Sequence, residues 1–117
     1  ADVVSGDGLH EGGFIAAGLA TQQRAILGAT RFATRDVDAT QYRAGLGDDT
    51  ESCVRQGALL ACLGAIDRAA SLAGEDARLL IGGGDAASLL PYLSPRWTPR
   101  PLLVLEGLLA IAGDAHP

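Results

Sequence analysis

Two short segments combine residue types that can bind a phosphorylated or polar ligand. In the first, the apolar run at 79–81 leads into Gly82, Gly83 and Gly84, and Asp85 then opens an amphipathic pattern. A glycine turn between a strand and a helix leaves backbone amides free near the helix N-terminus, where phosphates often bind. The same residues also suit a tight turn in which Asp85 caps the helix. The sequence is neither GxGxxG nor a P-loop, so both interpretations stay open.

The second segment is GDDTES at 47–52. Thr50 offers a hydroxyl, and the neighbouring acids Asp48, Asp49 and Glu51 offer carboxylates for metal binding or proton transfer. A structural role is equally consistent, because Asp and Thr side chains accept hydrogen bonds from the first amides of a helix and early acids complement its dipole. No second ligand cluster elsewhere in the sequence pairs with these acids.

Two further segments have a structural explanation beside a functional one. In EGGFIAAG at 11–18, Gly12 and Gly13 either present backbone to a ligand or form a bulge or a close crossing of strands. Glu106 lies inside an apolar helical pattern, where an acid more often pairs with an amide or an arginine than acts as a catalyst. The sequence holds no GxSxG motif, Cys/His cluster or aromatic platform, so serine-nucleophile, zinc and base-stacking sites are unsupported.

The elements that hold these segments follow from the apolar spacing and from glycine and proline. Residues 1–18 indicate a hairpin around a turn at 6–8, and a helix is expected over 19–32. A polar loop at 33–47 leads to a long helix that begins at the acids and ends at Gly74. Residues 77–83 predict a buried strand, followed by a short helix with a break at Pro91, an extended link at 94–101 and a last helix. The fold class is therefore α/β, with a small mixed sheet covered by helices.

The long helix has two recognisable stripes. One is a core stripe, and the other consists of small residues and lets another backbone pack closely, within the chain or across a dimer. The core stripe is Leu59, Leu63, Ile66 and Ala70, and the small stripe is Gly57, Ala61 and Gly64. Cys53 and Cys62 lie roughly 13 Å apart along this helix, which excludes a disulfide between them. We expect two buried free thiols in a reducing compartment.

Composition limits the class of protein. The 117 residues suffice for one domain with a hydrophobic core. The net charge of −5 and nine scattered arginines argue against nucleic-acid binding, and the apolar runs are too short to span a membrane. We therefore expect a cytoplasmic protein with neither kind of partner. Because the chain begins at Ala1 inside a strand-like apolar run, we also expect it to be a piece of a longer protein.

Four segments resemble, in order, motifs in the C-terminal half of the type III pantothenate kinases. These motifs are a GG-hydrophobic-PG segment, a G-x-x-T helix with repeated glycines, a strand-GGDA turn and a closing L-V-L-E-G-L helix. Their counterparts here are EGGFIAAGL, GDDTESCVRQGALLACLGAIDRA, LLIGGGDAASL and LLVLEGL, in a resemblance that covers the chain from about Asp2 to Ala112. No single motif is very specific, but the ordered set of four is.

The resemblance implies a ribonuclease-H-like half of an actin-like, sugar-kinase-like ATPase. Residues 1–117 would then be the C-terminal domain of a longer kinase, without the first strand of that domain. The implied reaction transfers the γ-phosphoryl group of ATP to pantothenate, the first step of coenzyme A synthesis, in a homodimer that uses a divalent metal such as Mg²⁺ and a monovalent cation, K⁺ or NH₄⁺. By the same resemblance, Thr50 contacts pantothenate, and Gly83, Gly84, Asp85 and Ala86 lie near the nucleotide.

Some parts of the family pattern have no match in this chain. They are the N-terminal D-x-G-N-T loop, the G-A-D-R motif with the catalytic Asp, and the D-x-G-T-A loop with the cation ligand. We therefore expect no catalytic and no metal-binding residue here, and no kinase activity from the chain alone. Ala17 replaces a usual Pro, and Gly82 replaces a common Thr. Two alternatives stay open, which are a non-catalytic accessory member of the family and another sugar-kinase-like nucleotide-binding protein.

Overall fold

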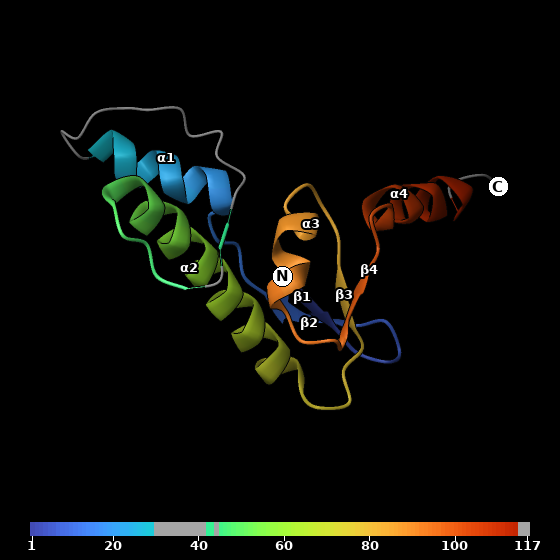
Figure 1. The fold of residues 1–117 in the computed structure, drawn as a ribbon. Helices are drawn as coiled ribbons and strands as arrows, with labels where there is room; N and C mark the ends of the chain where they lie inside the picture. Colours follow the sequence, from blue (N-terminus) through green and yellow to red (C-terminus); the bar gives the residue numbers. More distant parts are fainter. Residues whose placement is uncertain (30–41, 44, 115–117) are drawn as a thin grey trace. The chain divides into compact units, whose positions relative to one another are not determined.

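The computed structural model describes residues 1–29, 42–43 and 45–114 of the chain (Figure 1). Its contacts divide the chain into two compact units, Ala1–Ala77 and Arg78–Pro117. The first unit holds the strands β1 (Asp2–Val4) and β2 (His10–Gly13) and the helices α1 (Leu19–Ala29) and α2 (Thr50–Ala73). The second unit holds β3 (Leu79–Ile81), α3 (Ala86–Leu89), the 3₁₀ turn η1 (Leu90–Tyr92), β4 (Trp97–Pro99) and α4 (Leu103–Asp114). The α/β class is confirmed.

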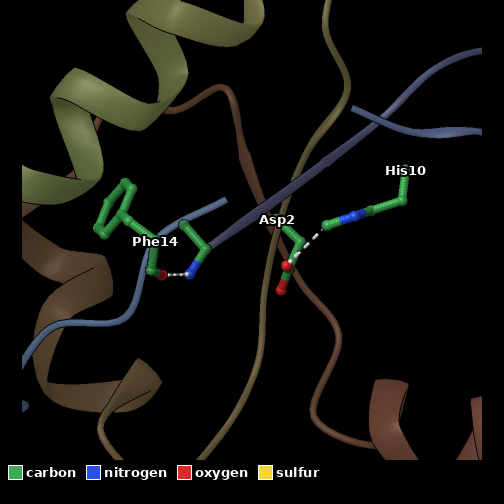
Figure 2. A network of polar contacts seen from close by, with 4 residues as sticks. Asp2, His10 and Phe14 are labelled. Carbon is green, nitrogen blue, oxygen red and sulfur yellow. Dashed lines mark hydrogen bonds and ion pairs between the residues drawn. The ribbon is translucent and has the colours of Figure 1, made fainter. Parts of the chain in front are cut away.

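Strands β1 and β2 form the antiparallel hairpin that the sequence predicts. Polar contacts tie its two strands together, as Figure 2 shows: the Ala1 backbone nitrogen donates to the Phe14 carbonyl at 2.9 Å, and His10 Nε2 lies 3.0 Å from Asp2 Oδ1. The register shifts between Val3 and Val4. A Cβ at Gly13 would lie 2.2 Å from the Ala1 carbonyl oxygen, so a side chain there has no room. Both the irregular register and the close crossing predicted for this segment are present.

Helices α1 and α2 pack against each other and form most of the core of the first unit (Figure 1). Its buried apolar residues are Leu19, Leu27, Ala58, Leu59 and Ala69. Two glutamines are buried beside them, and Gln23 donates from Nε2 to the Tyr42 hydroxyl at 3.0 Å, which satisfies part of its polar group. The described part of α1 ends at Ala29, and the predicted extension over 30–32 lies outside the described residues.

Helix α2 begins and ends where the sequence predicts, but its two stripes differ from the prediction. Leu59 is buried, whereas the rest of the predicted core stripe is only half-buried. The small stripe is exposed, and a Cβ at Gly57 or Gly64 would meet no atom within 4 Å. Close packing of another backbone on this stripe is therefore not found within the described residues of the chain.

Strands β3 and β4 of the second unit pair in parallel, with Leu79 opposite Trp97 and Ile81 opposite Pro99. The Arg100 amide continues this pairing by donating to the Ile81 carbonyl at 2.7 Å. The described residues thus form one two-stranded sheet in each unit, antiparallel in the first and parallel in the second. Local patterns predicted β3 as a strand and the β4 segment as an extended link, but they carried no information on which segments become neighbours.

Helix α4 is apolar along most of its length, and none of its residues is buried. Its exposed large side chains include Val104, which is 74% exposed, and Leu109, which is 73% exposed. Among the described residues, no helix is both long enough and apolar enough to cross a membrane.

Candidate functional site

The first turn of α2 is held by reciprocal hydrogen bonds between Asp49 and Ser52. Asp49 is the N-cap, with extended backbone (φ −135°, ψ 170°), and its Oδ1 accepts from the Ser52 amide at 2.6 Å. In return, the Ser52 hydroxyl oxygen accepts from the Asp49 amide at 3.0 Å and from the Asp48 amide at 3.1 Å. This capping box satisfies amides that a helix start otherwise leaves without partners. It places Thr50 as the first residue of the helix.

Gly47 lies directly against this turn. A Cβ at Gly47 would fall 2.3 Å from the Cys53 nitrogen, so only glycine lets the incoming chain pass so close to the helix. The Cys53 thiol also donates to the Gly47 carbonyl at 3.4 Å. The prediction that both thiols are buried is wrong for Cys53, which is exposed to solvent. Cys62 is half-buried. Both cysteines are free thiols.

Hydrogen bonding shifts the acidity of the cap. The Ser52 amide, and next the Ser52 side chain, hold the pKa of the Asp49 carboxyl below its ordinary value, because both interactions favour the ionised form. Arg55 and Arg43 add weaker attraction. Of the two interpretations of GDDTES, the helix-cap interpretation is therefore present in the structure, with Asp49 as the acceptor.

An open pocket of about 630 Å³ lies beside the same turn, within the first unit. One end is polar, and the wall beyond it is apolar or lacks side chains. The lining consists of Ile26 of α1, residues Gly47, Asp48, Asp49 and Thr50 at the start of α2, and Cys53, Val54 and Gly57 farther along α2. Thr50, the predicted substrate-binding residue, is thus exposed at the polar end of a pocket.

Sequence reasoning named Asp48, Asp49 and Thr50 as candidate ligand residues and missed the rest of this wall. Cys53, Val54 and Gly57 follow Thr50 at spacings of three, four and seven residues, which place them on the same helix face. That spacing was a usable signal. Ile26 comes from a different helix, and no pattern within α2 indicates it.

The glycine loop of the second unit is shaped by two different constraints. A Cβ at Gly82 would lie 2.6 Å from the Arg100 carbonyl oxygen, so this position has no room for a side chain. Gly83 has φ +99°, a conformation that L residues rarely adopt, and its carbonyl accepts from the Ala86 amide at 3.2 Å. The tight-turn interpretation of the segment is therefore present. Gly83 and Gly84 are also exposed, with backbone that a ligand can approach.

Asp85 lies at the N-cap position of α3, but its side chain makes no capping hydrogen bond to that helix. The predicted role of Asp85 as a side-chain cap is therefore wrong. The four-residue α3 also has too few aligned peptide groups to build a strong helix dipole.

Glu106 pairs with Arg100 through Oε2 and Nη2, as expected for an acid in an apolar helix. Both side chains are partly exposed. Among the described residues, no group of three or more His, Cys, Asp or Glu side chains is arranged to hold a metal ion. The acids at the start of α2 form no such group, and one of them, Asp49, is engaged in the helix cap.

The candidate residues fall in different units. Thr50 and its pocket lie in Ala1–Ala77, and Gly83, Gly84 and Asp85 lie in Arg78–Pro117. The contacts described above therefore concern each set of residues within its own unit.

Known proteins provide an independent comparison. A family profile described as type III pantothenate kinase matches residues 1–71, which include the hairpin, α2 up to Ser71 and the pocket. A protein named type III pantothenate kinase from Nitrosococcus oceani is 35% identical over 118 residues, covering 97% of this chain and 44% of that protein. One of the same name from Xanthomonas oryzae pv. oryzae is 38% identical over 124 residues, covering 97% of this chain and 47% of that protein. The chain therefore spans slightly less than half the length of these curated relatives.

Proposed function

The chain belongs to the type III pantothenate kinase family, and we propose that the protein carrying it transfers the γ-phosphoryl group of ATP to pantothenate, the first step of coenzyme A synthesis. The observation that carries this proposal is the pocket beside the start of α2, with Thr50 among the residues at its polar end. Thr50 is also the residue that matches the pantothenate-contacting threonine of the family motif.

In this proposal the pocket binds the acceptor and not the transferred phosphate. The Thr50 hydroxyl hydrogen-bonds a polar group of pantothenate, and the Asp49–Ser52 capping box keeps the first helical turn in place. The acceptor oxygen then bonds to the γ-phosphorus while the bond between that phosphorus and the β,γ-bridging oxygen breaks and ADP leaves. The acceptor's proton passes to a base that this chain does not supply, because the motif with the catalytic Asp has no match here.

The glycine loop is proposed as a wall of the nucleotide site. Exposed backbone at Gly83 and Gly84 suits close approach of a flat or polar group, and Asp85 follows directly. The divalent metal, the K⁺ or NH₄⁺ ion, the homodimer and the cytoplasmic location are further parts of the proposal that come from the family resemblance. Metal ions supply charge neutralisation in phosphoryl transfer when they are bound, and the described residues include no cluster of three or more His, Cys, Asp or Glu side chains.

The chain alone is proposed to be inactive. Purified 117-residue protein, incubated with ATP, MgCl₂, KCl and pantothenate, should release no ADP above the rate without pantothenate. Pantothenate-dependent ADP release by this chain would overturn that part of the proposal.

Substitution of Thr50 in the full-length protein tests the acceptor site. We expect Thr50→Ala to raise the KM for pantothenate by roughly tenfold, as loss of one substrate hydrogen bond should, with the KM for ATP changed less than twofold. Thr50→Ser keeps the hydroxyl and should largely restore the KM. Thr21→Ala, which removes an exposed threonine from α1 outside the pocket, is the matched control. An equal rise of the KM for pantothenate and of the KM for ATP in Thr50→Ala would contradict the assigned role.

A further inference from the structure

We propose that Gly57 determines which acceptors the pocket admits, because its missing side chain keeps open the end of the pocket away from Thr50. This inference rests on the proposed function, since it assigns the pocket to the acceptor. It concerns a residue two helical turns from Thr50 that no motif comparison singles out for binding.

Position along α2 gives the first argument. Gly57 follows Thr50 by seven residues, which is about two turns or roughly 10 Å along the helix axis. Both residues line the pocket, and so do Cys53 and Val54 between them. The pocket therefore follows one face of α2 from its polar start to Gly57, with a length that suits a small extended molecule.

The second argument is that nothing else in the described structure requires glycine at this position. Gly57 lies inside a 24-residue helix, where glycine costs about 1 kcal/mol relative to alanine. Its φ is not positive, and a Cβ built on it would meet no atom within 4 Å. Within the described residues, neither backbone conformation nor a neighbouring atom requires glycine at position 57, and Gly57 lines the pocket, so we infer that the open space there serves the bound molecule.

The lining also indicates the chemical class of the acceptor. Asp48, Asp49 and Thr50 make one end polar, while Val54 lies farther along α2 and Ile26 of α1 adds a second branched aliphatic side chain to the lining. A short molecule with hydroxyl groups next to a branched hydrocarbon centre matches this order, and pantothenate has such a structure. A side chain at position 57 would occupy the space beside Val54 and compete with the hydrocarbon part.

The test uses the full-length kinase and three variants. Gly57→Leu places a large side chain in the pocket, and Gly57→Ala places a single methyl group there. Gly64→Leu is the matched control, because Gly64 lies on the same stripe one heptad later, also has open space at its Cβ, and does not line the pocket. All three substitutions raise helix propensity, so loss of helix is not a competing explanation.

We expect Gly57→Leu to raise the KM for pantothenate at least about tenfold, in line with the usual effect of filling a pocket by a few carbon atoms. Gly57→Ala should give a smaller increase, and the KM for ATP should change less than twofold in both. Gly64→Leu should match the wild type. Pantothenate should also slow the reaction of the Cys53 thiol with a thiol reagent in the wild type and in Gly64→Leu, but not in Gly57→Leu.

The possible results separate the two proposals. A wild-type protein that does not phosphorylate pantothenate overturns the proposed function. An active wild type whose KM for pantothenate is unchanged by Gly57→Leu overturns the role of Gly57 and leaves the function standing. An equal rise of both KM values, or the same rise in Gly64→Leu, also overturns the role of Gly57, because the effect would then not come from the pocket.

Discussion

The Asp49 carboxylate accepts a 2.6 Å hydrogen bond from the Ser52 amide, and the Ser52 hydroxyl accepts a 3.0 Å hydrogen bond from the Asp49 amide. This reciprocal pair lies directly beside the residue proposed to bind the acceptor. The contribution of this pair to the stability of the fold can be measured by unfolding experiments, without any measurement of catalysis.

Removal of the cap should weaken the first unit. Asp49→Ala leaves the first amides of α2 without their side-chain acceptor, and we expect Tm to fall by roughly 3–6 °C. The Tm of Asp49→Asn should fall much less, because asparagine caps a helix almost as well as aspartate. Thermal unfolding followed by circular dichroism at 222 nm measures both. A fall of the same size in Asp49→Asn would show that the charge and not the cap matters.

The same carboxyl predicts a dependence of stability on acid. Because the pKa of Asp49 is lowered from 3.8 in the folded state, its stabilisation is fully present above pH 3.8 and is lost as the pH falls through the lower folded value. Asp49→Asn has no carboxyl to protonate. Urea midpoints of the wild type and of Asp49→Asn should therefore be measured from pH 6 to pH 2.5. Below about pH 3.8, the midpoint of the wild type should fall relative to that of Asp49→Asn. A constant difference over this range would contradict the assignment.

Two adjacent glycines of the second unit should respond differently to alanine. Gly82→Ala forces a methyl group to within 2.6 Å of the Arg100 carbonyl and should destabilise by about 1–3 kcal/mol, as other overpacked sites do. Gly84→Ala meets no atom within 4 Å and has no positive φ, so its effect should stay within about 0.5 kcal/mol. Urea unfolding monitored by the fluorescence of Trp97 compares them. Similar destabilisation in both variants would refute the close approach at Gly82.

Glu106 should act as a structural partner of Arg100. Glu106→Gln breaks a partly exposed ion pair, so the cost in stability should be less than about 1 kcal/mol and should shrink in 1 M NaCl. In the full-length kinase, kcat should stay within about threefold of the wild type, whereas loss of a general acid or base lowers it about a hundredfold or more. Arg100→Gln is the complementary control, because it breaks the same pair. A hundredfold loss of kcat in Glu106→Gln alone would reassign this acid to catalysis.

The parts of this structure that follow from local rules were predictable. The start of α2 is encoded by Asp49 and the residues after it, and Gly74 with φ +97° ends the helix one residue beyond Ala73. The pairing of Glu106 was also predictable, because an acid in an apolar helix needs a partner and Arg100 is close in sequence. In each case the deciding interaction joins residues within six positions of one another.

What could not be predicted depends on contacts between distant segments. The pairing of β3 with β4 joins residues 18 positions apart, and nothing in either strand specifies its neighbour. The pocket needs Ile26 of α1 beside the start of α2, which only the packing of the two helices produces. The exposure of Cys53 follows from the same packing, because the periodicity of α2 alone does not say which face α1 covers. The ribonuclease-H-like assignment remains a prediction for the same reason.

Gly82 and Gly83 are adjacent in the loop after β3, yet different constraints limit which residue can occupy each position. At Gly82 the restriction is volume, since the Arg100 carbonyl occupies the space of any Cβ. At Gly83 an added Cβ would meet no atom within 4 Å, and the restriction is the sign of φ. The second restriction is one of handedness: a D-alanine introduced at position 83 by peptide ligation has the positive φ as its own preferred conformation. The turn thus discriminates between mirror images at one α-carbon and between sizes at the next.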